Sequence, residues 1–241
     1  QELRHRLAIG GQGFVHASQP SAFSLTQSSE SGAVYTPEEV AELAAIAKES
    51  GLGVHMDGAR FANALAALNT ENQSTSPADI TWRAGVDVLS FGATKNGALG
   101  AEAVILFRTD LAEEMSFRRK RAGQLASKMR YISTQLAAYI EDGLWLRLAD
   151  HANRLCGALA QGLGAISGVV INSYGGANEL FVELPGEMVI ALRQEGFKFY
   201  DWPETIPAVA GRRCTIRLVT RHDMTKSEVE GLITAVKRLA V

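Results

Sequence analysis

Short apolar runs alternate along the chain with longer segments in which apolar residues recur at helical spacing. The short runs are bounded by turn residues and predict strands, whereas the longer segments predict helices. In the first half, strands are expected at 21–27, 53–56, 86–91 and 103–107, with helices over 37–50, 59–68 and 76–84. Strands that alternate with helices in this way favour an α/β fold with a mostly parallel sheet.

The helix after the first strand has clear signals at both ends. We expect Thr36 at its N-cap, Pro37 at its first position and Glu39 in a capping box. Gly51 can close the helix at its C-terminal end. Residues 1–12 resemble the tail of an amphipathic helix, so the chain reads as a piece of a longer protein.

The second half predicts a different arrangement. Residues 109–164 are expected to be nearly all helical, and a last helix is opened by a capping box of Thr225 and Glu228. Between these helices, strands are expected at 169–172, 179–184, 198–202 and 215–219, with a helix over 187–194. We therefore expect a large domain over residues 1–143 and a small C-terminal α+β domain over residues 144–241.

Composition and charge narrow the class of protein. The chain is 46% hydrophobic and 21% charged, with a formal net charge of −2, which points neither to nucleic acid nor to an anionic membrane. No apolar run has the length of a membrane span and no signal peptide opens the chain, so we expect a cytoplasmic protein. Cys156 and Cys214 lack metal-like spacing; we expect two buried, inert thiols and no metal site.

Two charged residues follow predicted strands. Asp57 ends the strand at 53–56, and Lys95 follows the strand at 86–91 in a glycine-rich loop. Ligands of parallel α/β sheets sit beyond the carboxyl ends of the strands. Considered alone, Asp57 is best explained as a helix cap, and Lys95 as an exposed lysine.

Considered together, the two residues suggest a cofactor. Pyridoxal phosphate needs a lysine for its aldehyde and an acidic group at its pyridine nitrogen. Asp57 and Lys95 fit these two roles. We expect His55 to lie on the opposite face of its strand from Asp57 and to pack in the core, and His151 to be structural or exposed.

The motifs HMDGARFANA and SFGATKNG, which contain Asp57 and Lys95, closely resemble the threonine aldolase/β-eliminating lyase family of fold-type-I pyridoxal phosphate enzymes. The stretches LTQSSESGAVYTPEEV, RRKRAGQLASKMRYIS and IRLVTRHDMT resemble parts of bacterial low-specificity L-threonine aldolases. The resemblance covers essentially the whole chain, and it is far more specific than any single residue.

The resemblance implies a role for each matching residue. Lys95 corresponds to the lysine that forms a Schiff base with pyridoxal 5'-phosphate, and Asp57 to the partner of the pyridine nitrogen. Arg60 matches the arginine near the cofactor phenolic oxygen and the substrate carboxylate. Arg217 resembles the arginine that binds that carboxylate, with two parallel hydrogen bonds that a lysine could not make. Two further residues are implied at the cofactor: Thr94 near the phosphate, and Arg130 at a neighbouring subunit's site.

The implied reaction is the retro-aldol cleavage of a β-hydroxy-α-amino acid, of the threonine or allo-threonine type, to glycine and an aldehyde. The resemblance also implies a homodimer or homotetramer. Fold and cofactor do not fix the reaction, so another lyase, an aminotransferase or a non-catalytic fragment stay open as alternatives.

The chain departs from the family in two ways. Many members have a histidine in the stretch that aligns with residues 26–30, where this chain has Ser29 and Glu30, so the base is not identified. Family members are also expected to have roughly a hundred more residues before Gln1, which supply the phosphate-binding loop. We therefore expect the 241 residues alone to bind the cofactor poorly.

Overall fold

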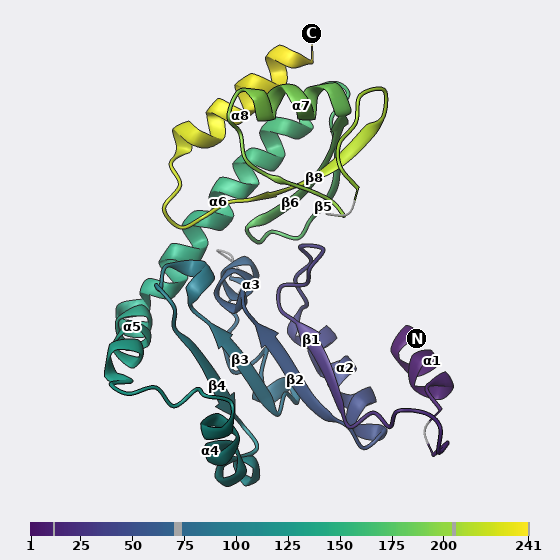
Figure 1. Ribbon diagram of the computed structural model, residues 1–241, viewed down its shortest axis with the longest axis vertical. Helices are drawn as coiled ribbons and strands as arrows, with labels where there is room; N and C mark the ends of the chain where they lie inside the picture. The colour runs from purple at the N-terminus through teal and green to yellow at the C-terminus, as the bar shows by residue number, and fades with distance from the viewer. Residues whose placement is uncertain (12, 70–73, 204–205, 241) are drawn as a thin grey trace. The chain divides into compact units, whose positions relative to one another are not determined.

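The computed structural model describes residues 1–11, 13–69, 74–203 and 206–240. The chain forms two compact units. Unit 1 contains residues 1–27, 35–61 and 68–142, and unit 2 contains 28–34, 62–67 and 143–241. Each unit has its own four-stranded sheet (Figure 1).

Unit 1 is built on a mostly parallel sheet in the order β1-β2-β3-β4. Its strands are β1 (Ala22–Thr26), β2 (Gly53–Gly58), β3 (Val88–Gly92) and β4 (Glu102–Leu106). The first three strands are parallel, whereas β4 runs antiparallel to β3. The segment between β3 and β4 is too short for the crossover helix that a parallel pair requires. The α/β architecture predicted from the sequence is confirmed.

The helices of unit 1 follow their sequence signals closely. They are α1 (Glu2–Ile9), α2 (Pro37–Glu49), α4 (Ala112–Arg121) and α5 (Arg130–Ile140), whereas α3 (Phe61–Leu68) is assigned mostly to unit 2. The predicted capping box of α2 is present, since Thr36 and Glu39 each accept a hydrogen bond from the other's backbone N–H. Helix α1 buries no side chain, so it does not use an amphipathic face within this chain.

Two predictions of helix were wrong in detail. Residues 76–84 form turns and one short 3-10 helix, Trp82–Ala84, instead of an α-helix. The Ser76 hydroxyl and N–H both donate to Asp79, and the Thr81 hydroxyl donates to the Pro77 carbonyl, so local side-chain bonds replace helical ones. The stretch 109–164 is also interrupted near Gly123 and Gly143, which both adopt positive φ, a conformation that ends helices.

Unit 2 has an antiparallel sheet in the order β5-β6-β8-β7, with helices on one face (Figure 1). Its strands are β5 (Val170–Tyr174), β6 (Glu179–Pro185), β7 (Tyr200–Asp201) and β8 (Arg213–Val219), and its helices are α6 (Leu144–Gly164), α7 (Gly186–Gln194) and α8 (Lys226–Leu239). The strand expected at 198–202 shortens to two residues. The α6, α7 and α8 side chains pack with β6 and β8 around one apolar core.

The two cysteines differ in environment, which corrects the expectation that both are buried. Cys156 is fully buried in the unit 2 core, and burial raises the pKa of its thiol to about 12. Cys214 is only half-buried. In the part of the chain that the structure describes, no cluster of His, Cys, Asp or Glu could hold a metal ion, and no helix is long and apolar enough to cross a membrane.

This difference predicts selective alkylation. The thiolate is the reactive form of cysteine, so iodoacetamide at pH 8 should label Cys214 and leave Cys156 unmodified until the protein is unfolded in urea. Peptide mapping by mass spectrometry measures both sites in one sample. Equal labelling of both cysteines in the folded protein would contradict the buried position of Cys156.

Candidate active site at the strand ends of unit 1

Asp57 and Lys95 lie at the same edge of the unit 1 sheet. Strands β2 and β3 are parallel neighbours, with Asp57 opposite Ser90 and Gly58 opposite Phe91. Lys95 follows the end of β3 within a 3-10 turn, Thr94–Asn96. The carboxyl ends of adjacent parallel strands therefore carry an acid and an amine, as the sequence pattern predicted.

Two glycines allow the ends of β2 and β3 to approach closely. A Cβ on Gly92 would lie 2.8 Å from the Ala59 Cα, and a Cβ on Gly58 would lie 2.8 Å from the Ser90 carbonyl oxygen. Both distances are shorter than real Cβ contacts, so a side chain at either position would push the strand ends apart. The end of β3 at Gly92, just before the loop that holds Lys95, consequently lies against the turn after Asp57.

Asp57 closes a turn and does not cap the following helix. Its Oδ1 accepts a hydrogen bond of 2.9 Å from the Ala59 N–H, two residues along the chain. Helix α3 begins only at Phe61, so the carboxylate stands before the helix, in a turn that an Asp side chain commonly stabilises. Arg60, between the turn and the helix, is buried, with 9% of its surface exposed.

The loop around Lys95 is held by residues that the sequence interpretation did not single out. The Asn96 amide donates to the Tyr139 hydroxyl over 2.6 Å, and both residues are buried. The Leu99 N–H donates to Gln135 and the Thr94 N–H donates to Glu102. Lys95 itself is exposed. The hydrogen-bonded loop therefore holds the Lys95 backbone in place while its side chain faces solvent. No local pattern around Lys95 indicates these contacts, because Tyr139 and Gln135 come from α5.

We expect Tyr139→Phe to destabilise the protein, because it removes a hydrogen bond that holds this loop. The variant leaves the buried Asn96 amide without the hydroxyl that now accepts its hydrogen bond, which costs about 1–3 kcal/mol of unfolding free energy. Urea unfolding measures the change. Tyr131→Phe, at a tyrosine that is 67% exposed on the same helix, is the matched control and should stay within about 0.5 kcal/mol of the parent. Equal stability of both variants would contradict the prediction.

His55 lies on the same face of the sheet as Asp57, which corrects the expectation of opposite faces. Side chains alternate with a period of two, so residues 55 and 57 share a face. The His55 ring bonds the Ser24 hydroxyl through Nδ1 at 2.8 Å and the Ser90 hydroxyl through Nε2 at 2.9 Å. His55 is thus part of a polar row across β1, β2 and β3, and not of the apolar core. His151, by contrast, bonds the Met224 carbonyl oxygen in a structural role, as expected.

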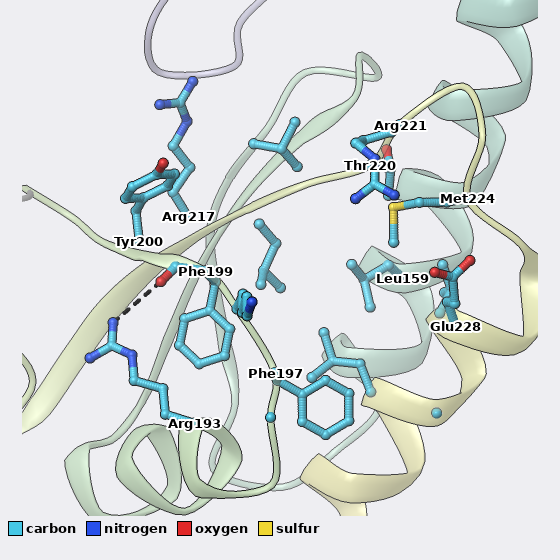
Figure 2. Close-up of a pocket in the computed structure, with 17 residues that line it drawn as sticks. Leu159, Arg193, Phe197, Phe199, Tyr200, Arg217, Thr220, Arg221, Met224 and Glu228 are labelled. Carbon is cyan, nitrogen blue, oxygen red and sulfur yellow. Dashed lines mark hydrogen bonds between the residues drawn. The ribbon is translucent and has the colours of Figure 1, made fainter.

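Arg217 belongs to unit 2, on β8. Its Nε and Nη2 both donate to Oε1 of Glu179, with an Nε–Oε1 distance of 2.9 Å. Figure 2 shows Arg217 and Tyr200, which are paired across β7 and β8, pointing away from the apolar side chains Leu159 and Met224. All four residues are among those that line one cavity of about 1170 Å³ beside α8. Because Nε and Nη2 both donate to Glu179, one edge of the Arg217 guanidinium is already bound to a carboxylate of the same chain.

The two remaining predicted site residues are both exposed. Thr94 is exposed at the start of the Lys95 turn, and Arg130 is exposed at the first position of α5, where its guanidinium stacks 5.1 Å from the Tyr131 ring. Ser29, in unit 2, accepts the Ala33 N–H and bonds the Ser31 hydroxyl, so it holds a turn within its own loop.

Comparison with known proteins supports this description of the fold. The structure of a Leishmania major threonine aldolase superposes with a TM-score of 0.84 at 28% identity, covering 94% of this chain and 63% of that one. A serine palmitoyltransferase from Sphingomonas wittichii shares the fold, with a TM-score of 0.64 and 15% identity over 100% of this chain and 59% of its own.

Sequence comparison finds nearer relatives. A low specificity L-threonine aldolase from Pseudomonas aeruginosa is 46% identical over 188 residues, which cover 78% of this chain and 53% of the relative. One from a Pseudomonas species is 44% identical over 188 residues, with the same coverage of 78% and 53%. The chain thus spans about half the length of the curated relatives that it matches.

The fold is that of the fold-type-I pyridoxal-phosphate-dependent enzymes, with a mostly parallel sheet followed by a smaller α+β part. Within that class, the chain belongs to the β-eliminating lyase family, whose model matches residues 1–185.

Proposed function

We propose that the protein containing this chain is a pyridoxal-phosphate-dependent aldolase. It cleaves β-hydroxy-α-amino acids of the threonine or allo-threonine type to glycine and an aldehyde. The observation that carries the proposal is the position of Asp57 and Lys95 at the ends of two adjacent parallel strands, where Gly92 at the end of β3 packs against the turn after Asp57. The similarity to low specificity L-threonine aldolases favours this reaction over others of the same fold.

The residues at this edge suit the cofactor chemically. The exposed Lys95 amine can hold its aldehyde as a Schiff base, and the Asp57 carboxylate can keep a proton on its pyridine nitrogen. Thr94, Arg60 and Arg130 are proposed to contact the cofactor, as the family resemblance implies. When bound, the cofactor supplies an electron sink for the pair of electrons released at the substrate Cα.

The protein's own residues have the tasks of binding and orientation. We propose that Arg217 binds the substrate carboxylate, with Arg60 assisting, because a fixed carboxylate determines which bond at Cα breaks. In the net reaction the Cα–Cβ bond breaks, the β-hydroxyl proton leaves to a base, and Cα gains a proton. Balanced this way, threonine yields acetaldehyde and glycine.

The test measures both products from the full-length protein. Incubation with L-threonine, L-allo-threonine or phenylserine should release aldehyde and glycine in equal amounts, and an alcohol dehydrogenase with its reduced cofactor can follow acetaldehyde. Keto-acid formation without glycine would show an aminotransferase. No cofactor absorbance band and no product would show a non-catalytic protein. Cytoplasmic location, a homo-oligomeric state and the division at residues 143–144 stay predictions.

A further inference from the structure

Glu179 is a buried charge in unit 2. It is the first residue of β6, and its exposed fraction is 0%. Burying a carboxylate is expensive unless an opposite charge and hydrogen bonds compensate it. Arg217 supplies both, because its Nε and Nη2 donate to the same oxygen, Oε1.

The guanidinium of Arg217 is held on a second side by an aromatic ring. Its Cζ lies 5.5 Å from the centre of the Trp202 ring, which packs against Phe181 with ring centres 5.1 Å apart. The Arg217 side chain is only 13% exposed. One edge and one face of the guanidinium are consequently fixed, and the Nη1 end is directed away from Glu179 by the planar geometry of the group.

A loop of the same unit packs against Glu179 and Phe181. A Cβ on Gly32 would lie 3.4 Å from both the Glu179 carbonyl oxygen and the Phe181 ring. The Ser173 hydroxyl donates to the Ser31 carbonyl oxygen over 2.6 Å, which anchors that loop to β5. The loop therefore helps to bury Glu179, and the exclusion of water from this carboxylate strengthens its electrostatic interaction with Arg217.

We infer that Glu179 is a positioning residue for Arg217. It fixes the guanidinium so that only the end carrying Nη1 is presented to a ligand carboxylate. This inference rests on the proposed role of Arg217 in binding the substrate carboxylate. Glu179 would then contribute to affinity through the orientation of the guanidinium.

Four variants of the full-length, cofactor-loaded protein test the inference, with glycine as the ligand. Glu179→Leu removes the acceptor, Glu179→Asp keeps the charge but withdraws the acceptor by one methylene, and Glu179→Gln keeps the length and an acceptor oxygen. Glu183→Leu is the matched control, because Glu183 forms a more exposed pair with Arg213 on the same two strands.

The measurement is the dissociation constant of glycine, followed by the change in cofactor absorbance. We expect Glu179→Leu to weaken glycine binding about tenfold or more, as the loss of a charged hydrogen bond predicts. Glu179→Asp should weaken it less, whereas Glu179→Gln should keep glycine binding within about threefold of the parent or tighten it. Unchanged binding in both the Leu and Asp variants would overturn the inference.

A second measurement does not depend on cofactor or activity. Phenylglyoxal modifies exposed arginines, so in the cofactor-free protein Arg217 should react faster in Glu179→Leu than in the parent. Arg213 serves as the internal reference when the peptides are mapped. An unchanged rate at Arg217 would overturn the inference, and if the Leu variant does not fold, the Asp variant decides by the same rate.

The two proposals fail in different ways. If the parent protein binds glycine and cleaves threonine but the Glu179 variants bind glycine normally, only the role of Glu179 is wrong. If the parent neither binds glycine nor cleaves threonine, the proposed function is wrong. In that case, the phenylglyoxal rate still tests whether Glu179 holds Arg217.

Discussion

Replacing Lys95 with alanine is expected to abolish the cofactor absorbance band and to lower aldehyde release by at least about 10³-fold, the order lost with a catalytic group. The side chain is exposed, so its truncation should change stability by no more than about 0.5 kcal/mol. The loss therefore reports chemistry and not unfolding. Absorbance spectra, urea unfolding and the aldehyde assay on the full-length variant measure the three quantities.

The matched control is Lys120→Ala, at an exposed lysine of α4, which should leave all three quantities unchanged. Reduction with borohydride followed by peptide mapping adds a direct test, because it fixes the cofactor to the lysine that holds it. The label should appear on Lys95 in the parent protein. A label on another lysine, or a persistent band in Lys95→Ala, would show that the assignment is wrong.

Local patterns predicted most of the elements correctly. Short apolar runs bounded by turn residues placed β1, β2, β3 and β4, and the capping boxes at Thr36 and Thr225 placed the starts of α2 and α8. These signals act over a few residues, so they can be recognised in the chain itself. At residues 76–84 the pattern predicted a helix that does not form. There, side chains bond to nearby groups of the chain, as when Asp79 accepts hydrogen bonds from the Ser76 N–H and hydroxyl.

The candidate site was only partly predictable for a related reason. Asp57 and Lys95 follow strands, and the strand ends are set by local sequence. The contacts that support them join distant segments: Asn96 and Tyr139 lie 43 residues apart, and Glu179 and Arg217 lie 38 residues apart. Nothing in either local stretch indicates its partner. The position of His55 was predictable, because the alternation of a strand places residues 55 and 57 on one face.

Replacing Arg217 with alanine is expected to destabilise the protein as well as to weaken substrate binding. The variant removes the ion-pair partner of Glu179, a carboxylate with 0% exposure. Removing one partner of a buried pair costs about 3–5 kcal/mol of unfolding free energy. Urea unfolding of the full-length protein measures this change. Arg213→Ala, which breaks a more exposed pair with Glu183, should cost only about 0–1 kcal/mol.

A double variant separates stability from binding. In Glu179→Leu with Arg217→Leu, both charges are replaced by apolar side chains, and such exchanges are often neutral for stability. The double variant should therefore recover most of the unfolding free energy that Arg217→Ala loses. It should still fail to bind glycine, while the cofactor absorbance band persists, because Lys95 and Asp57 are untouched. Parent-like stability of Arg217→Ala would instead mean that the buried Glu179 carboxylate does not need Arg217 as its ion-pair partner. Loss of the cofactor band in the double variant would mean that Arg217 serves the cofactor and not the substrate carboxylate.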